Sequence, residues 1–558
     1  MQANPVLEIS ALNISFGSQR VVDSLSFSVF AGQTTALVGE SGSGKSVTAL
    51  SIMRLLVNAV ITAQNVAFDS ALFGNINLSV IPEKQMRRLR GREIGMVFQD
   101  PLSSLNPLIR VGEQVTEHLI QHLQVSKNEA NRRCVELFEA VQLPRISQII
   151  QSYPHQLSGG QKQRVMIAIA LACNPKLLIC DEPTTALDVT VQHALLRLLR
   201  ELQKKLNLAI LFISHDLGLV RAFGGNVVVL YRGKCLESGH IEQVFEHPQH
   251  PYTQALLACR PSIKDRLNRL PTVADFWPDA EPIIKQSPNY FQPLPCTPSG
   301  TMLAVENLQV SYYRRVPFWK PKPEPFQVLK CVNFELDYRT TLGVVGESGC
   351  GKTTLIRTIL GLQKAEKGKI FFENTNLITL KTDSWKPFRK RIQLVFQDPY
   401  SALNPRITIG DAIAEGLVVH RVVAKGEVER EVRRLLSLVG LGDGFLARFP
   451  SQLSGGQRQR AVIARALSTR PDLLICDEAV SALDVSVQAQ IINLIKDLQE
   501  GLGLTCIFIS HDLAVIRQLC DNVLIMDHGN IVESGKIDQV LTYPKHEQTR
   551  QLIAAAFV

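Results

Sequence analysis

The sequence predicts an α/β protein built from two copies of one domain, each with a central and mostly parallel sheet. Three observations carry this prediction. The same landmark motifs occur twice, apolar runs without alternation lead into glycine-rich or acidic turns, and 558 residues exceed what one hydrophobic core holds. Strands of parallel sheets are buried on both faces, so their sequences are continuous apolar runs.

The internal repeat sets the domain organisation. The octapeptides LSGGQKQR and LSGGQRQR begin 296 residues apart, and His215 and His511 keep the same separation. Lys45 and Lys352 are 307 residues apart, whereas Gln99 and Gln397 are 298 apart, so the first half holds nine more residues between these landmarks. We expect that region to vary in length without disturbing the rest.

A proline-rich segment separates the two halves. Residues 261–300 hold eight prolines and no periodic apolar pattern, which is typical of an extended, semi-rigid linker. The predicted domains are therefore residues 1–260, a linker over 261–302, and residues 303–558.

The composition and the first residues favour a globular protein that is not secreted. Hydrophobic residues make up 45% and charged residues 20%, and apolar stretches such as 208–213 are far shorter than the roughly 18 residues that span a bilayer. The start MQANPVLEIS lacks a secretory signal, so we expect a cytoplasmic chain. The 11 cysteines include no CxxC pair, which argues against disulfides and a zinc site.

The net charge of +9 leaves more than one interpretation open. The basic clusters at 84–92 and 386–391 lack the interleaved aromatic residues that stack on bases. We therefore expect no nucleic-acid partner, and either an anionic membrane surface or no specific partner for this charge.

Each half contains a phosphate-binding loop between a predicted strand and a predicted helix. GESGSGKS at 39–46 and GESGCGKT at 346–353 both fit GxxxxGK[ST]. In such a loop, backbone N–H groups surround phosphate oxygens and the lysine reaches the β and γ phosphates. The predicted ATP ligands are Gly39, Ser41, Gly42, Gly44, Lys45 and Ser46 in the first half, and Gly346, Ser348, Gly349, Gly351, Lys352 and Thr353 in the second.

Two carboxylates follow the apolar run LLIC in each half, as Asp181-Glu182 and Asp477-Glu478. This places them at the carboxyl edge of a sheet, where α/β proteins bind ligands. We predict that each aspartate holds Mg²⁺ together with Ser46 or Thr353, and that each glutamate orients and deprotonates the attacking water. The alternative is a solvated acidic turn, which the phosphate loops upstream disfavour.

A histidine follows another apolar run in each half. His215 and His511 both lie in the sequence Ile-Ser-His-Asp. A lone histidine is usually a surface or core residue, but recurrence at the matched separation favours contact with the γ-phosphate. We therefore include both histidines among the predicted catalytic residues.

Four motifs occur in the same order in both halves: the phosphate loop, a glutamine (Gln99 or Gln397), LSGGQ and the acidic strand end. In this order they resemble the motifs of the ATP-binding cassette family. The resemblance covers nearly the whole chain outside the linker. It implies two P-loop ATPase domains, each with a mostly parallel core, an antiparallel β part and a helical subdomain. It also implies that the two glutamines contact Mg²⁺ and the attacking water. Phe16 and Tyr312 fall where the family places an aromatic ring under adenine, although each could instead be a core residue.

The same resemblance assigns the LSGGQ motifs to composite sites. In this family the serine and glycines of LSGGQ contact nucleotide held by the opposite cassette. Ser158, Gly159 and Gly160 would therefore complete the site built on Lys352, and Ser454, Gly455 and Gly456 the site built on Lys45. The implied unit is an intramolecular pair of cassettes with two ATP sites.

Two extended motifs resemble the dipeptide and oligopeptide importer subfamily. These are the glutamine segments VFQDPLSSLNP at 97–107 and VFQDPYSALNP at 395–405, and the tail HPQHPYT at 247–253, which is partly repeated at 544–549. The resemblance implies a bacterial ATPase on the cytoplasmic face of the inner membrane, two transmembrane permease subunits as partners, and, indirectly, a substrate-binding protein. Microcin C, oligopeptide and glutathione import all remain open.

A tandem ATPase acting on ribosomes or DNA is the alternative class. A ribosome factor is expected to carry a long charged linker, and a DNA-repair ATPase to carry zinc-binding cysteine pairs; this sequence has neither. Only Cys259 and Cys296 lie between the first tail and the second half, so we expect no iron–sulfur cluster. The segments 102–105 and 400–403 are the predicted docking loops for the permease.

Overall fold

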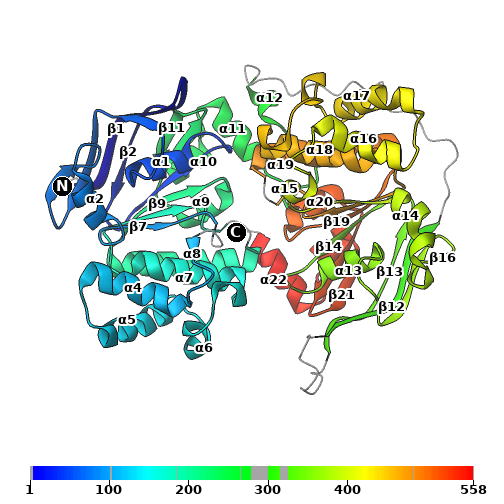
Figure 1. The fold of residues 1–558 in the computed structure, drawn as a ribbon, viewed down its shortest axis with the longest axis horizontal. Helices are drawn as coiled ribbons and strands as arrows, with labels where there is room; N and C mark the ends of the chain where they lie inside the picture. Colours follow the sequence, from blue (N-terminus) through cyan, green and yellow to red (C-terminus); the bar gives the residue numbers. More distant parts are fainter. Residues whose placement is uncertain are drawn as a thin grey trace. The chain divides into compact units, whose positions relative to one another are not determined.

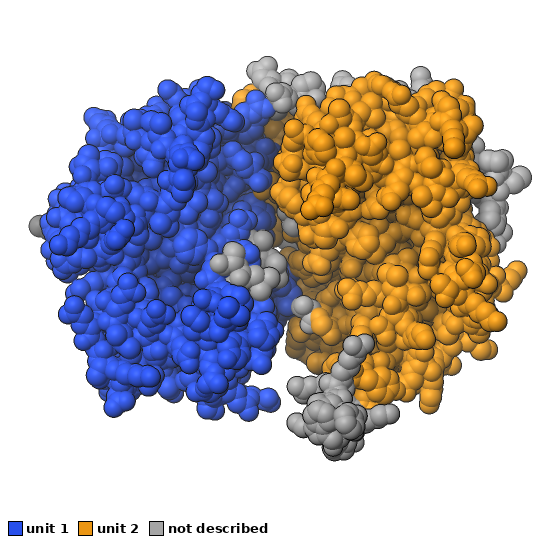
Figure 2. All heavy atoms as spheres, viewed as in Figure 1, with its two compact units in different colours: residues 1–257, 558 blue, residues 258–557 orange. Residues whose placement is uncertain are grey.

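The computed structural model of the chain describes residues 4–100, 104–184, 187–263, 265–277, 300–313, 325–347, 349–481 and 483–556. The predicted ligand Ser348 and the predicted docking residues Leu102 and Ser103 lie outside these ranges. The chain divides into two compact units, unit 1 up to Leu257 and unit 2 from Ala258 (Figure 2).

Unit 1 is built on a sheet in the order β11-β10-β3-β9-β8-β7. All neighbours pair in parallel except the edge strand β11. Strands β3, β8 and β9 are buried along their whole length, which explains their continuous apolar sequences. The bounds are β3 Thr34–Val38, β7 Ile94–Val97, β8 Leu177–Asp181, β9 Ala209–Ser214, β10 Asn226–Tyr231 and β11 Lys234–His240.

A second, antiparallel sheet covers part of unit 1. Its order is β2-β1-β5-β6, with β4 paired to β1. Apolar side chains from both sheets form one core, to which Leu7 and Phe68 contribute from the antiparallel sheet and Leu211 and Ile213 from the parallel sheet. The bounds are β1 Pro5–Phe16, β2 Gln19–Phe30, β4 Ala59–Thr62, β5 Asn65–Ser70 and β6 Gly74–Asn77.

The helices of unit 1 fall into two groups. Helices α4, α5, α6 and α7 contact one another and form a helical subdomain, of which α4, α5 and α6 lie at the end of the unit opposite β1 and β2 (Figure 1). The bounds are α1 Lys45–Ile52, α2 Glu83–Leu89, α4 Val111–Leu123, α5 Lys127–Ala140, α6 Ile146–Ile150, α7 Gly159–Leu171, α8 Val189–Leu206, α9 Leu217–Phe223, α10 Ile241–Glu246 and α11 Pro251–Ala258.

Unit 2 repeats this plan, apart from β4, which has no counterpart among its described strands. Its main sheet has the order β17-β18-β19-β14-β20-β21, and its antiparallel sheet the order β13-β12-β15-β16. The bounds are β12 Thr301–Tyr312, β13 Phe326–Asp337, β14 Thr341–Val345, β15 Lys367–Phe372, β16 Thr375–Asn376, β17 Ile392–Val395, β18 Leu473–Asp477, β19 Thr505–Ile509, β20 Asn522–Asp527 and β21 Asn530–Lys536. The predicted fold class is confirmed: both units are α/β with a mostly parallel core, an antiparallel part and a helical subdomain.

Apart from α12 and α15, the helices described for unit 2 have described counterparts in unit 1, and α16, α17 and α18 contact one another as its helical subdomain. The bounds are α12 Val273–Phe276, α13 Lys352–Ile359, α14 Lys386–Arg391, α15 Pro399–Ala402, α16 Ile409–Val419, α17 Val428–Leu438, α18 Gly455–Leu467, α19 Val485–Leu502, α20 Leu513–Leu519, α21 Ile537–Thr542 and α22 Glu547–Ala556. None of the helices that the structure describes combines the length and apolar character needed to cross a lipid bilayer.

The nine additional residues of the first half lie between α1 and β7. Strand β4 is inserted there between α1 and β5, and it extends the antiparallel sheet at β1. The insertion changes the rim of that sheet and leaves the parallel core of the two units alike.

Candidate active sites

In both units the phosphate loop connects a fully buried strand to a helix. Strand β3 leads to α1, which begins at Lys45, and β14 leads to α13, which begins at Lys352. The glycine before each lysine is left-handed, with φ of 101° at Gly44 and 113° at Gly351. A Cβ added to Gly44 would also lie 2.9 Å from the Val22 side chain. Backbone conformation and available space therefore both require glycine at this position.

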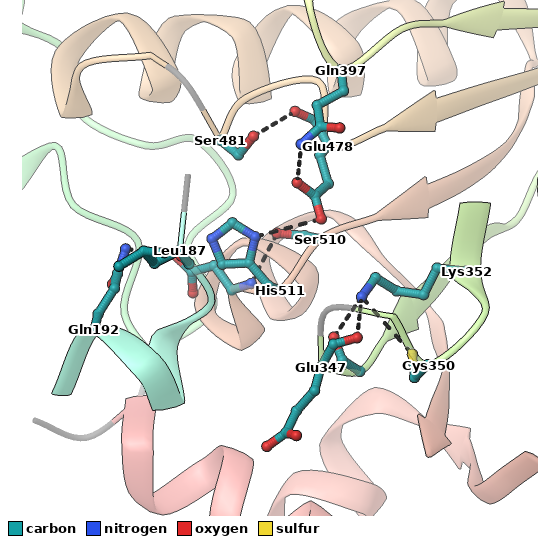
Figure 3. Close-up of polar contacts among 12 residues, drawn as sticks. Leu187, Gln192, Glu347, Cys350, Lys352, Gln397, Glu478, Ser481, Ser510 and His511 are labelled. Atoms are coloured by element: carbon teal, nitrogen blue, oxygen red, sulfur yellow. Dashed lines mark hydrogen bonds and ion pairs between the residues drawn. The ribbon is translucent and has the colours of Figure 1, made fainter. Parts of the chain in front are cut away.

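The two loop lysines are buried and bind back onto their own loops. Lys45 Nζ donates to the carbonyl oxygens of Gly39 and Glu40, both at 2.8 Å. Lys352 Nζ donates to the corresponding carbonyls of Gly346 at 2.6 Å and Glu347 at 2.9 Å (Figure 3). Each ammonium group is thus held at the loop, beside a helix N-terminus whose positive potential favours anions. This arrangement suits the phosphates of a nucleotide.

Glutamine, glutamate and histidine meet at the carboxyl ends of three neighbouring strands in unit 1. They follow β7, β8 and β9, which are adjacent in the sheet. Gln99 Nε2 donates to Glu182 Oε2 at 2.9 Å. His215 Nδ1 lies 3.1 Å from Glu182 Oε1. Both carboxylate oxygens of the glutamate are therefore oriented by a neighbour.

Unit 2 has the same constellation at the ends of β17, β18 and β19. Gln397 Nε2 donates to Glu478 Oε2 at 2.7 Å, and His511 Nδ1 lies 3.7 Å from Glu478 Oε1 (Figure 3). Burial tends to lower the pKa of His511, but the nearby carboxylate of Glu478 raises it above its ordinary value. Burial tends to raise the pKa of Glu478, but the nearby imidazole of His511 lowers it below its ordinary value. The pair thus favours an ionised carboxylate, the form that accepts a proton.

Both glutamates adopt a backbone conformation that sequence reasoning did not foresee. The φ angles of Glu182 and Glu478 are 45° and 46°, in the left-handed region. A residue other than glycine in this region costs about 1–3 kcal/mol when the surroundings impose it. Because both units hold the same strain at the same residue, we infer that it sets the direction of the carboxylate.

The aspartates that end β8 and β18 are suited to a hard cation. Ser46 Oγ donates to Asp181 Oδ1 at 2.9 Å, so a hydroxyl and a carboxylate lie together beside the loop lysine. Chiefly through burial, the pKa of Asp181 is raised to about 6 and that of Asp477 to about 6. Oxygen ligands of this kind, completed by phosphate oxygens, fit Mg²⁺.

The raised pKa values predict that both aspartates destabilise the nucleotide-free protein. A folded pKa near 6 above the ordinary 3.8 means that the folded state loses stability as pH rises through this window, and that the full cost is present above it. Asp181→Asn or Asp477→Asn should therefore raise the free energy of unfolding by about 2–3 kcal/mol at pH 7.5, and by about half of that at pH 5.

Thermal unfolding without nucleotide or metal at the two pH values measures this effect. Asparagine keeps an acceptor oxygen for Ser46, so the hydrogen bond is not a confounding loss. A lower melting temperature in the variants, or a gain that does not depend on pH, would contradict the assignment.

The LSGGQ motifs form the N-termini of two 13-residue helices, α7 and α18. Ser158 caps α7 and forms a capping box with Gln161, and Ser454 forms the same box with Gln457. Both serines are exposed. A Cβ at Gly456 would lie 2.4 Å from the Val487 side chain, so this glycine also permits close packing of α18 against α19. The motif thus presents exposed backbone donors at a rigid helix end.

The two aromatic residues predicted under adenine end equivalent strands. Phe16 is the last residue of β1 and is partly buried against the core of unit 1. Tyr312 is the last residue of β12, is 38% exposed, and its hydroxyl lies 3.5 Å from Thr354 Oγ1. Their role in stacking remains a prediction.

A contact that sequence reasoning missed joins the HPY tail to the first phosphate loop. The backbone N–H of Glu40 donates to the hydroxyl oxygen of Tyr252 at 3.2 Å, across 212 residues of sequence. Tyr252 is fully buried, and its ring lies 4.7 Å from that of Tyr231. The matching position in unit 2 is Gln548, so this support is specific to unit 1.

Tyr252→Phe should weaken ATP binding at the first loop by about threefold to tenfold, because it leaves the Glu40 N–H without this acceptor while keeping the ring. Nucleotide titration in a Lys352→Ala background, which disables the second loop, isolates the effect. Gln548→Ala in a Lys45→Ala background is the matched control. Unchanged affinity in the Tyr252→Phe chain would show that the contact does not position the loop.

These features define a pair of P-loop nucleotide-binding units, each with an LSGGQ helix and a Gln-Glu-His constellation. The chain belongs to the ABC transporter family: that family's profile matches residues 22–185 and 329–481. The profile of the oligopeptide/dipeptide transporter C-terminal region matches residues 236–285. The resemblance to the family that the motifs predicted is confirmed, and the chain is an ABC-type ATPase.

Its relatives include proteins that match it over nearly its whole length. The glutathione import ATP-binding protein GsiA of Pectobacterium atrosepticum is 43% identical, over 99% of this chain and 89% of the relative. The protein of the same name from Escherichia coli K12 is 43% identical, over 100% of this chain and 90% of the relative. Among solved structures, CbiO1 from Clostridium perfringens, part of an ABC transporter complex, is 28% identical with a TM-score of 0.39, over 44% of this chain and 91% of that one.

Proposed function

We propose that the chain hydrolyses ATP to drive import of a peptide-like compound through a separate membrane permease. The observation that carries this proposal is the match to the oligopeptide/dipeptide transporter C-terminal region, in a chain whose two units both keep the complete ATPase constellation. Full-length relatives named for glutathione import support it. Glutathione and other short peptides are the first substrates to test.

In the proposed reaction the phosphate loop binds ATP and the strained glutamate acts as the base. Glu182 or Glu478 accepts a proton from the attacking water, which Gln99 or Gln397 orients, and His215 or His511 contacts the γ-phosphate. Mg²⁺, when held through Ser46 and Asp181 or through Thr353 and Asp477, neutralises phosphate charge.

The LSGGQ helices would act on nucleotide held by the other unit. The support is the exposure of their serine caps and the donors of a helix N-terminus, which favour an anion. Ser158, Gly159 and Gly160 would then serve the site of Lys352, and Ser454, Gly455 and Gly456 that of Lys45.

A groove on unit 2 is the proposed docking surface for a permease helix. It is a pocket of about 380 Å³ between β17, α14, α16 and α18, with Leu362, Phe396 and Val419 among its lining residues. These three side chains are 67%, 43% and 69% exposed. Arg389 adds positive charge to the lining. Arg465 also lines the groove, but its guanidinium lies 3.5 Å from the Glu415 carboxylate in an ion pair. An amphipathic helix with an acidic edge fits such a groove.

Unit 1 carries part of the same apolar patch at equivalent positions. Leu55 and Phe98 are exposed and match Leu362 and Phe396 in the repeat, whereas Gln121 stands at the position of Val419. A patch repeated in both units supports two permease contacts, one for each unit.

In unit 2 the docking segment is bound to the LSGGQ helix. The guanidinium of Arg458 lies 3.6 Å from the centre of the Tyr400 ring, and Arg465 Nη1 donates to the carbonyl oxygen of Ala402 at 2.6 Å. Both arginines belong to α18, which Ser454 caps. A permease helix that displaced α15 would therefore move the LSGGQ end of this helix.

The partners that follow are two transmembrane permease subunits and, through them, a substrate-binding protein, with the chain peripheral on the cytoplasmic face of the inner membrane. We keep the domain boundaries 1–260, 261–302 and 303–558 as part of the proposal. Helix α11 ends at Ala258, two residues before the first of these limits, and β12 begins at Thr301, two residues before the last.

A host strain that lacks the chain tests the function. Uptake of labelled glutathione and of a di- and tripeptide panel should disappear on deletion and return with the wild-type gene. Normal uptake of every compound in the deletion strain, together with recovery of the chain on ribosomes, would refute the import function.

A further inference from the structure

The segment that follows the first tail belongs to unit 2. We call residues 258–263 and 265–277 the strap; they come directly after the part of α11 that belongs to unit 1, and they include α12. Ile263, Leu270 and Val273 of the strap are buried, with 8%, 1% and 6% of their surfaces exposed. The strap is thus anchored by apolar side chains, unlike a solvated spacer.

Two buried amide side chains of unit 2 bind the strap backbone. Asn493 on α19 donates from Nδ2 to the carbonyl oxygen of Leu270 at 2.8 Å and accepts from the Leu270 N–H at 2.9 Å. Gln518 on α20 accepts from the Leu267 N–H at 3.1 Å and donates to the Leu267 carbonyl oxygen. Asn493 and Gln518 are 3% and 1% exposed. Without the strap, both amides would lose these partners at a cost.

Charged groups surround this amide pair on the same two helices. Lys496 Nζ donates to the carbonyl oxygen of Asn268 at 2.8 Å, and Arg517 donates to that of Ile263. Arg269 lies 3.5 Å from Asp497 in an ion pair. Side chains of α19 and α20 therefore bind the strap from Ile263 to Leu270.

This binding surface is specific to unit 2. In the repeat, Asn493 corresponds to Arg197 and Gln518 to Ala222, neither of which offers an amide. Of these two helix pairs, α19 and α20, and not α8 and α9, therefore carry amides that pair with both the N–H and the carbonyl oxygen of one strap residue. Replacing Asn493 and Gln518 with the matching residues of unit 1 should therefore abolish binding of the strap.

We propose that the α19–α20 face of unit 2 is a docking site for the strap, and that this docking ties unit 1 to unit 2 without need of the covalent connection through residues 278–299. The tie does not depend on nucleotide, because it involves none of the phosphate loop, LSGGQ or Gln-Glu-His residues. It keeps the two halves together whenever the nucleotide sites are empty.

A cleavable full-length chain tests this proposal. A protease recognition sequence is inserted between residues 278 and 299, the purified chain is cut without nucleotide, and the two fragments are analysed by size exclusion at decreasing concentration. The wild-type fragments should elute together. In the cut Asn493→Arg/Gln518→Ala chain, the dissociation constant should rise by about 100-fold, because two paired buried amides are lost.

Two controls keep the result interpretable. Leu270→Asp changes the strap and leaves unit 2 unaltered, so it should separate the fragments equally. Arg197→Asn/Ala222→Gln, the reciprocal exchange in unit 1, should leave co-elution unchanged. Separation of the wild-type fragments, or co-elution of the Asn493→Arg/Gln518→Ala and Leu270→Asp fragments at wild-type concentrations, would overturn the proposal, and neither outcome bears on what is transported.

Discussion

Replacing Glu182 and Glu478 together with glutamine is expected to slow ATP turnover by roughly 10²- to 10⁴-fold, because the base that accepts the proton of the attacking water is lost. Nucleotide binding should persist, since the loop lysines make their contacts with other groups. The glutamine side chain keeps an acceptor oxygen for Gln99 and Gln397. Steady-state hydrolysis and a nucleotide titration measure the two quantities separately.

The single variants and two exposed glutamates complete the experiment. Glu182→Gln and Glu478→Gln should each reduce turnover, because both units hold the same constellation and the same strained φ. Glu136→Gln and Glu429→Gln, whose side chains are 58% and 74% exposed on helices, should leave turnover unchanged. Loss of ATP binding in the double variant, or one silent and one inactive single variant, would be incompatible with two equivalent sites.

Placing a charge in both apolar patches is expected to abolish uptake while sparing ATP binding. Leu55→Asp/Leu362→Asp puts a carboxylate on each proposed docking surface, where burial against a permease helix would leave it unpaired. Neither leucine lies in a phosphate loop. We expect uptake to fall at least about tenfold, together with loss of co-purification with the permease from membranes.

Exposed apolar residues elsewhere provide the matched control. Leu206 and Tyr543 are 37% and 76% exposed and belong to neither patch. Leu206→Asp/Tyr543→Asp should transport and co-purify normally. Equal losses in both double variants would mean that surface charge, and not the patch, decides the outcome.

Much of the candidate site could be predicted because parallel sheets constrain it. The glutamine, glutamate and histidine each follow an apolar run, and neighbouring parallel strands bring their carboxyl ends to one edge. Gln397 therefore lies within hydrogen-bond distance of Glu478, and His511 within ion-pair distance of it, although the three residues are far apart in sequence. The phosphate loop is equally local, because its glycines, lysine and helix start fall within eight residues.

Other features depended on contacts that no short motif encodes. The left-handed φ of Glu182 and Glu478 results from the surrounding fold, since glutamate alone does not favour it. The Tyr252 contact spans 212 residues and the Leu270 contact with Asn493 spans 223. Prolines marked residues 261–300 as a spacer, whereas Ile263 and Leu270 are buried on unit 2.

The docking segments show a limit of motif reasoning. The motifs predict that the stretches 102–105 and 400–403 are surface loops that meet the permease, but Leu105 and Leu403 are each only 2% exposed. Tyr400, at 62% exposure, is the large apolar side chain that the described part of these stretches presents to solvent. Without the fold, a leucine that packs in the core cannot be distinguished from a leucine that contacts a partner protein.

The central claim is that ATP hydrolysis by this chain drives import of a peptide-like compound. The most direct measurement is uptake by liposomes that contain the permease subunits in one known orientation. The chain and ATP are placed on one side of the membrane, and the substrate-binding protein with glutathione or a short peptide on the other. Accumulation should require ATP and should stop with the Glu182→Gln/Glu478→Gln chain. Hydrolysis at an undiminished rate with no accumulation of any peptide tested, or accumulation that continues with the double variant, would contradict the account.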